Sequence, residues 1–206
     1  MKPQTIITIS RQFGSGGHEV GELTAQKLAI PFYDKKLIEL ASKTSGIHQS
    51  HFENAEENPP TSFLYSLSMA ASAANPFTGY SDFTLSDQIF NAQANAVRKA
   101  ANEGACVIVG RCADSILQEY PDCLHVYIHA PLEDRIKRIM QQFDTDEKHA
   151  KEMIAKTDKK RKSYYQFYAN DYWGNADRYH LCLDSGNLGT ELCAQIIMKA
   201  AMRGEE

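Results

Sequence analysis

The chain has 206 residues, of which 43% are hydrophobic and 23% charged, and 22 Lys+Arg against 26 Asp+Glu give a formal net charge of −4. At roughly 100–200 residues per domain, we expect a single domain over residues 1–206, and the composition excludes collagen-like, disordered and disulfide-scaffold proteins. The mildly acidic balance argues against a protein whose whole surface follows nucleic acid.

The sequence shows no segment typical of a membrane span or a secretory leader. No apolar run approaches the roughly 20 residues that a spanning helix needs, and the strand-like run at 5–9 follows the N-terminus without a signal-peptide pattern. The 5 cysteines form no C-x-x-C pair and the 7 histidines show no ligand spacing. We therefore expect a cytoplasmic protein with free thiols, no membrane partner, and no zinc, haem or flavin.

The chain begins with an alternation of strand and helix patterns. A β-branched run at 5–9 predicts a strand, and the glycine-rich turn after it leads into an amphipathic helix over about 18–29. Residues 31–34 predict a short second strand, and 35–43 a second helix. This β-α-β-α order is typical of an α/β protein.

The periodicity then fades between residues 45 and 86, where Asn, Pro, Ser, Ala and Gly dominate and only 63–67 could form a short helix. An ordered domain rarely contains so long a plain loop without a functional reason, so we interpret 45–86 as an insertion.

The second half of the chain again alternates helix and strand patterns. A helix is expected to start near Ser86, as its N-cap, and to end at Gly104. The further expected elements are strands at 105–109, 124–128 and 181–183, a helix-length segment containing Ile116 and Leu117, and helices at 132–143, 146–168 and 190–202. Short apolar runs that alternate with helices predict a parallel sheet covered on both faces.

The glycine turn after the first strand is the strongest local signal for a phosphate site, because backbone N–H groups and the start of the next helix favour an anion. The dinucleotide pattern G-x-G-x-x-G would need Gly where Glu19 stands. The P-loop pattern G-x-x-x-x-G-K-[ST] would need Gly, Lys and Ser or Thr where Arg11, Gly17 and His18 stand. A turn that only lets strand and helix pack tightly remains an alternative.

Several segments together resemble the cytidylate kinase-like P-loop proteins. They are ISRQFGSGGH at 9–18, PFYD at 31–34, VIVGRCAD at 107–114, APL at 130–132 with RIKR at 135–138, TDKKR at 157–161 with YY at 164–165, and LCLDS at 181–185 with LG at 188–189. The resemblance implies a three-layer α/β fold with a five-stranded parallel sheet and a P-loop. It also implies an acceptor-binding insertion at 45–86 and a lid at 140–175. The implied reaction moves the γ-phosphoryl group of Mg²⁺·ATP to a nucleoside monophosphate, with CMP or dCMP as the leading acceptor.

The resemblance also implies roles for individual residues. The catalytic residues would be Arg135, Arg138, Asp158 and Arg161, and the ATP phosphates would lie on Arg11, Gly14, Ser15, Gly16, Gly17 and His18. The adenine would lie on Ser185 and Leu188, and the acceptor on Asp34, Gln88, Arg111 and Asp114. Magnesium would bind through the ATP phosphates, with a hydroxyl from Ser10 or Ser15.

Ordinary structural roles compete with these assignments. Asp34 could cap the next helix, Arg111 could form a surface ion pair, and Arg135 and Arg138 could be solvated on the helix face opposite the apolar stripe. The aromatic stretch at 164–173 is more typical of packing than of a base-stacking platform.

The departure from the P-loop pattern leaves other functions open. Arg11 would replace part of the missing lysine charge, and a protonated His18 would touch a phosphate. Alternatives are an ATP-binding regulator without catalysis, a kinase for another small metabolite, and nucleic-acid binding through 156–173, which rests on local charge and aromatic side chains alone. The expected partners are ATP and a nucleoside monophosphate rather than nucleic acid, with the chain a monomer or a homodimer.

Overall fold

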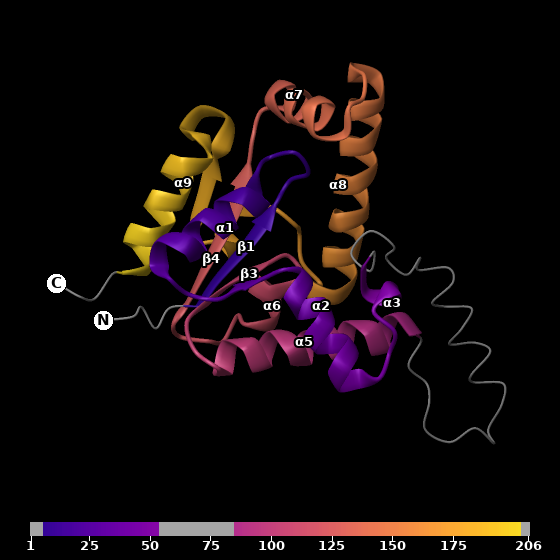
Figure 1. Ribbon diagram of the computed structural model, residues 1–206, viewed down its shortest axis with the longest axis vertical. Coiled ribbons are helices and arrows are strands. Elements are labelled where there is room, and N and C mark those ends of the chain that lie inside the picture. The colour runs from indigo at the N-terminus through magenta and orange to yellow at the C-terminus, as the bar shows by residue number, and fades with distance from the viewer. Residues whose placement is uncertain (1–5, 54–84, 203–206) are drawn as a thin grey trace.

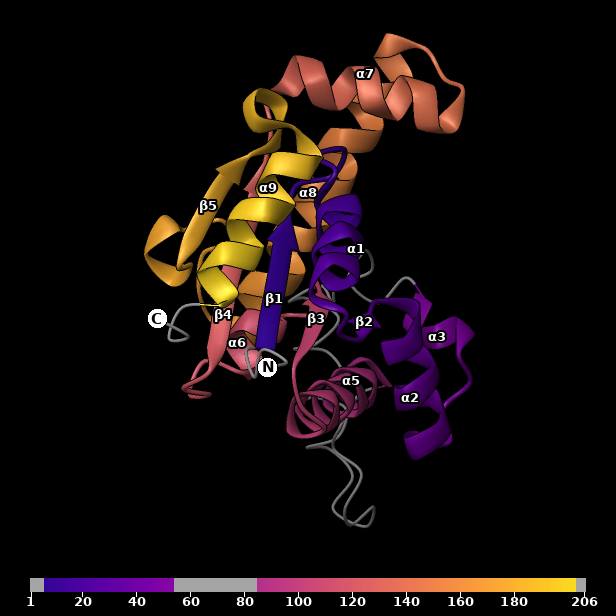
Figure 2. The same ribbon diagram turned by 60° about the vertical axis from the view of Figure 1, so that its left-hand side comes forward.

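A five-stranded parallel sheet forms the centre of the protein, whose computed structural model describes residues 6–53 and 85–202 (Figure 1). The strands are β1 (Ile6–Arg11), β2 (Phe32–Tyr33), β3 (Cys106–Val109), β4 (Cys123–His129) and β5 (Leu181–Asp184). All four strand pairings are parallel, in the order β2-β3-β1-β4-β5, and Figure 2 shows the strands side by side from β5 on the left to β2 on the right. The predicted fold class and sheet are confirmed.

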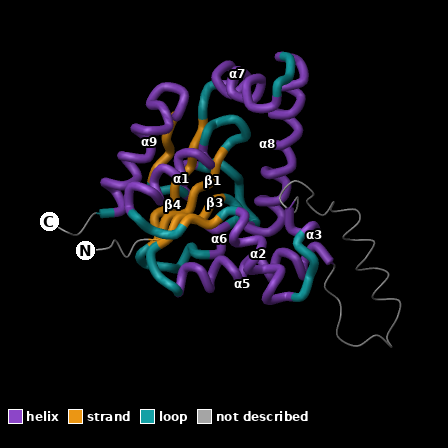
Figure 3. Tube along the Cα trace, viewed as in Figure 1, coloured by secondary structure: helices purple, strands orange, loops and turns teal. Residues whose placement is uncertain are grey.

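The helices follow the strands in the expected alternation (Figure 3). They are α1 (Gly17–Leu28), α2 (Lys35–Ser45), α3 (Ser50–Glu53), α5 (Leu85–Asn102), α6 (Ala113–Ile116), α7 (Leu132–Phe143), α8 (Glu147–Ala169) and α9 (Ser185–Ala201), with a 3₁₀ turn at Ala176–Arg178. Ser86 lies inside the first turn of α5, so its prediction as the N-cap was wrong. The expected short helix at 63–67, and most of the insertion at 45–86, lie outside the described residues.

Two hydrophobic clusters cover the two faces of the sheet. One joins Ile7 and Ile9 of β1 to the apolar sides of α1 and α9, and the other joins Ile6 of β1 and Ile108 of β3 to α2, α5 and α6. Neighbouring side chains of a strand point to opposite faces, so β1 contributes to both clusters. The central strand is thereby buried on both sides, and the loop after it starts from a fixed position.

Helices α7 and α8 extend beyond the carboxyl ends of the strands (Figures 1 and 2). They pack on each other through Ile136, Ile139, Ala150 and Ile154, and Phe13 of the loop after β1 packs against this cluster. Further along α8, Tyr164 and Tyr165 form a second cluster with Cys112. Helix α8 is therefore attached to the rest of the molecule at both the glycine turn and the α6 side of the sheet. No helix in the described ranges is long and apolar enough to cross a membrane.

Candidate functional site

The glycine turn connects β1 to α1 at the carboxyl edge of the sheet, and its shape is held by neighbouring elements. Gly14 and Gly16 have φ angles of 78° and 74°, a region that side chains strain to enter. The buried Ser15 hydroxyl lies 2.9 Å from the Gln12 carbonyl oxygen and 3.2 Å from that of Ile128. From α9, the Ser185 hydroxyl donates to the Ser15 carbonyl at 2.5 Å. These contacts fix the shape of the turn beside the first N–H groups of α1, which is the arrangement that favours an anion.

An ion pair from α7 and α8 holds the front of this turn. Arg135 Nη1 lies 2.5 Å from Asp158 Oδ2 and donates to the Phe13 carbonyl oxygen at 3.2 Å. The other carboxylate oxygen of Asp158 accepts the Phe13 backbone N–H at 2.8 Å. Arg135 is only 8% exposed, so its interpretation as a solvated side chain opposite the apolar stripe was wrong. The two residues act on the loop backbone as one unit.

A cavity of about 750 Å³ opens over the turn, and arginines from three elements line it. Arg161 of α8 donates to the Arg11 carbonyl oxygen at 3.4 Å, and its guanidinium carbon lies 5.5 Å from the centre of the Phe13 ring. The lining residues are Arg11, Gln12, Phe13, Gly14, Gly16, Gly17, His18, Glu19, Asp34, Lys35, Arg138, Gln141, Gln142 and Arg161. The sequence thus brings Arg11, Arg138 and Arg161 together around one concave surface.

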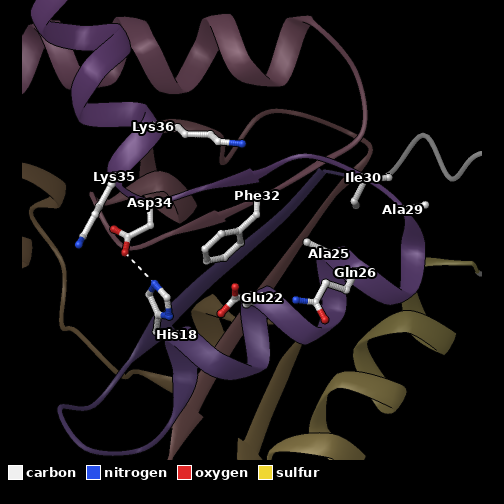
Figure 4. A pocket seen from close by; sticks show the side chains of 10 residues that line it. All are labelled: His18, Glu22, Ala25, Gln26, Ala29, Ile30, Phe32, Asp34, Lys35 and Lys36. Atoms are coloured by element: carbon white, nitrogen blue, oxygen red, sulfur yellow. Dashed lines mark ion pairs between the residues drawn. The ribbon is translucent and has the colours of Figure 1, made fainter. Parts of the chain in front are cut away.

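His18 and Asp34 connect the first turn of α1 with the end of β2, and Figure 4 shows them facing each other. Their Nε2 and Oδ2 atoms are 3.0 Å apart. The hydrogen bond that His18 donates to the Asp34 carboxylate raises the pKa of His18. Burial alone would raise the pKa of Asp34, but the His18 hydrogen bond and the positive charge of Arg11 outweigh it and lower that pKa. Asp34 precedes α2 without a side-chain capping bond, so its carboxylate faces His18 rather than the helix end.

The same ion pair also borders a second cavity, of about 590 Å³, between α1 and the β2–α2 connection (Figure 4). Phe32, Ala25 and Ile30 form its apolar part, and His18 and Asp34 stand at the boundary shared with the cavity over the glycine turn.

Arg111 and Asp114, both predicted to bind the acceptor, lie in the interior. Arg111 has a φ of 59°, is 7% exposed and donates to the Phe52 carbonyl oxygen at 3.3 Å, so it is not a surface side chain. Asp114 accepts hydrogen bonds from the hydroxyls of Ser10, at 3.3 Å, and Tyr165, at 2.7 Å. Burial raises the pKa of Asp114. The structure therefore makes Asp114 the point where α8 is joined to β1.

The remaining base-binding predictions are separate from the cavity over the glycine turn. Gln88 is exposed on α5, whereas Gln93 on the same helix is buried and accepts from the Tyr164 hydroxyl at 3.0 Å. Ser185 is buried against the glycine turn, and Leu188 packs on the cluster beneath α1 and α9. An adenine contact at these two residues and an acceptor contact at Gln88 stay predictions.

The two serines predicted to hold magnesium do not face the cavity. The Ser10 hydroxyl donates to Asp114, and the Ser15 hydroxyl points at backbone carbonyls. Asp34 instead lines the cavity with a carboxylate, the type of ligand that Mg²⁺ prefers. Within the described ranges, no group of three or more His, Cys, Asp or Glu side chains could hold a metal ion by itself. The site therefore fits a magnesium ion that arrives with phosphate oxygens and meets Asp34.

Sequence reasoning gave no role to two residues that shape the site. Phe13 carries both backbone groups that Arg135 and Asp158 bind, and Tyr165 joins α8 to Asp114. Both lie inside segments of the family resemblance, but no sequence pattern reveals these backbone and interior contacts. The interpretation of the aromatic stretch as packing is confirmed for Tyr164, Tyr165 and Tyr168, the last of which stacks on Phe90 with ring centres 4.0 Å apart, whereas Tyr172 is exposed.

The sheet order, with a glycine turn at the end of its central strand, defines a P-loop kinase fold. The chain belongs to the Cytidylate kinase-like family, whose model matches residues 6–187. No curated protein matches the sequence.

Solved structures share this fold. An uncharacterized protein from Eubacterium ventriosum is 29% identical, with a TM-score of 0.72, and the match covers 97% of this chain and 99% of that one. The shikimate kinase from Acinetobacter baumannii, solved in complex with shikimate, is 11% identical with a TM-score of 0.52 and coverages of 99% and 96%. The shikimate kinase from Bacteroides thetaiotaomicron is 12% identical with a TM-score of 0.51 and coverages of 95% and 97%. At these identities the two kinases show the fold alone.

Proposed function

We propose that the protein transfers the γ-phosphoryl group of ATP to a nucleoside monophosphate, with CMP and dCMP as the first acceptors to test. The observation that carries this proposal is the cavity in which a P-loop turn, the start of α1 and three arginines meet. Phosphoryl transfer asks little covalent chemistry of a protein and much positive charge directed at the phosphates. The site has that composition.

The residues around the turn would have separate roles in the reaction. The backbone N–H groups at Gly14, Gly16 and Gly17 would hold the ATP phosphates at the start of α1. Arg161, which enters from α8, would stabilise the charge that develops on the transferred group. Asp158 would act as a positioning residue, because its carboxylate is already committed to Arg135 and Phe13.

Magnesium fits this arrangement through Asp34 and phosphate oxygens, and when bound it would neutralise charge on the phosphates. Asp34 would serve the ion directly or through water, while His18 holds its carboxylate in place. The acceptor would approach from the side of Asp34 and Arg111.

The test is ADP release from Mg²⁺·ATP with a panel of acceptors, alongside direct titration of ATP binding. The panel contains nucleoside monophosphates and, because of the fold similarity to shikimate kinases, shikimate. Turnover with CMP, dCMP or another monophosphate supports the proposal and names the acceptor. Turnover with shikimate alone supports a kinase of another metabolite, and ATP binding without any turnover supports a regulator.

A further inference from the structure

The two adjacent glycines of the turn each lie against an arginine side chain. A Cβ atom added at Gly17 would be 2.4 Å from the Cβ and 2.9 Å from the Cγ of Arg11. A Cβ atom added at Gly16 would be 1.8 Å from Nη1 and 2.8 Å from Cζ of Arg138. Real Cβ atoms essentially never approach another heavy atom closer than 3.0 Å. The space of both missing side chains is therefore already filled.

The chemistry of these two neighbours is the same although their origins differ. Arg11 ends β1, and its aliphatic stem crosses Gly17, where the P-loop pattern would have lysine. Arg138 comes from α7, and its guanidinium lies on Gly16. Two cations thus reach the turn from outside α1, at the place where a P-loop usually receives one cation from within it.

Both arginines line the cavity over the turn, where an anion would lie. Nη1 of Arg138 is buried and has no hydrogen-bond partner among residues 6–53 and 85–202. A buried donor without a partner is unfavourable, and a phosphate oxygen would give it a charge-assisted hydrogen bond. Arg11 lines the cavity together with Gly17 and His18, so it lies beside the first turn of α1.

We propose that Arg11 and Arg138 together replace the P-loop lysine as the cations that bind a polyphosphate, and that position 17 is a glycine because the Arg11 stem occupies its side-chain space. The proposal rests on the proposed function only in taking the nucleotide polyphosphate as the ligand. Guanidinium groups suit this role because they bind phosphate oxygens with two parallel N–H bonds.

The charge part of the proposal is tested by Arg11→Met and Arg138→Met, which keep most of each stem and remove the guanidinium. Binding of magnesium tripolyphosphate, a probe with no base or sugar, is measured by calorimetry. Each substitution is expected to weaken binding about tenfold or more. Lys137→Met is the matched control, because Lys137 is an exposed cation on the same helix, and it should stay within about twofold of the parent protein. Affinity unchanged in either arginine variant would overturn the proposal.

The steric part of the proposal, the contact between Gly17 and the Arg11 stem, can be tested without a ligand. Gly17→Ala should lower Tm by about 5 °C in the parent protein, because the new methyl group meets the Arg11 stem. In an Arg11→Gly background the same substitution should lower Tm by clearly less, since the nearest remaining atom is Ile128 Cβ at 3.3 Å. Equal losses in both backgrounds would show that Arg11 is not the reason for a glycine at position 17.

A third variant moves the cation back to its usual place. The double substitution Arg11→Gly with Gly17→Lys should bind tripolyphosphate more tightly than Arg11→Gly alone, since it restores a charge at the start of α1. No gain in a variant whose Tm matches that of Arg11→Gly would count against the exchange.

These experiments distinguish a failure of the arginine proposal from a failure of the proposed kinase function. If tripolyphosphate binding depends on the arginines but no acceptor is phosphorylated, the arginine proposal is supported and the kinase function is refuted. If Arg11→Met and Arg138→Met leave turnover with CMP unchanged, the kinase function is supported and the arginine proposal is refuted.

Discussion

The carboxylate of Asp158 accepts the backbone N–H of Phe13 at 2.8 Å, although 145 residues separate them in the sequence. This bond attaches α8 to the glycine turn, and Arg135 completes the contact from α7. Helix α8, which lies within the expected lid at 140–175, and helix α7, which leads into it, therefore already touch the P-loop in the structure. Substitutions that remove this contact should therefore change both the free energy of unfolding and the shape of the glycine turn.

Removing the carboxylate of Asp158 should destabilise the protein strongly. Asp158→Ala leaves the buried guanidinium of Arg135 without its partner, and breaking a buried pair in this way typically costs about 3–5 kcal/mol. The double variant Asp158→Ala with Arg135→Met should recover part of the loss, measured by urea unfolding as a double-mutant cycle. Glu147→Ala, which breaks the exposed pair with Lys151, is the control and should change stability by less than about 1 kcal/mol. Simple additivity at Asp158 and Arg135 would refute the coupling.

Replacing Arg161 should affect turnover far more than nucleotide binding. Its guanidinium lies over Phe13 and beside the Arg11 carbonyl, where it can meet the transferred group. We expect Arg161→Ala to lower kcat about 100-fold or more while the Kd for ATP stays nearly constant. Lys156→Ala, an exposed cation on the same helix, serves as the control. An equal loss of ATP affinity and kcat would contradict a role confined to the transition state.

The pair of His18 and Asp34 should make a small part of the stability depend on pH. The hydrogen bond that His18 donates to the Asp34 carboxylate raises the pKa of His18 above its ordinary 6.5, so the stabilisation is complete below about pH 6.5 and is lost as pH rises through the folded-state pKa. The His18 side chain is 56% exposed, and solvent screening therefore limits the effect to about 1 kcal/mol or less. NMR titration of His18 in the parent and in Asp34→Asn measures the shift directly. A higher or equal His18 pKa in the Asn variant would refute this explanation.

Loss of one hydroxyl at Tyr165 should weaken the attachment of α8 to β1. Tyr165→Phe removes the hydroxyl that lies 2.7 Å from the buried Asp114 carboxylate, closer than that of Ser10 at 3.3 Å, and losing such a bond to a buried charged group costs about 1–3 kcal/mol. Urea unfolding should show this loss. Tyr172→Phe, at a side chain that is 67% exposed, removes the same atom from a solvated position and should have no measurable effect. A loss of the same size in both variants would assign the effect to something other than Asp114.

The sheet could be predicted from the sequence because its strands are short continuous apolar runs separated by helix-length segments. The boundaries of β1, β3 and β4 differ from expectation by one or two residues. The start of α9 was placed five residues too late, since Gly189, with φ 74° and ψ 159°, interrupts the helix and hides the turn before it.

The contacts of the site were harder to predict, because they depend on which elements meet. Spacing put Arg135 beside Arg138 on a solvated face, but α7 is covered on that side by the Phe13 loop and α8. Asp114 carries the same sequence signal whether it faces a ligand or the interior, and only the packing of Tyr165 decides between them. The steric relation between Gly17 and Arg11 likewise depends on the path of a single side chain.

The hydroxyl of Ser185 completes the glycine turn from the far end of the sequence, 170 residues after the carbonyl it binds. Helix α9, which begins at that serine, also packs with α1 in one cluster. During synthesis on the ribosome, the glycine turn is made early, but it can reach its final shape only after residues 185–201 have been added. A nascent chain that stops after β4 would have the glycines of the P-loop but not the final shape of the turn.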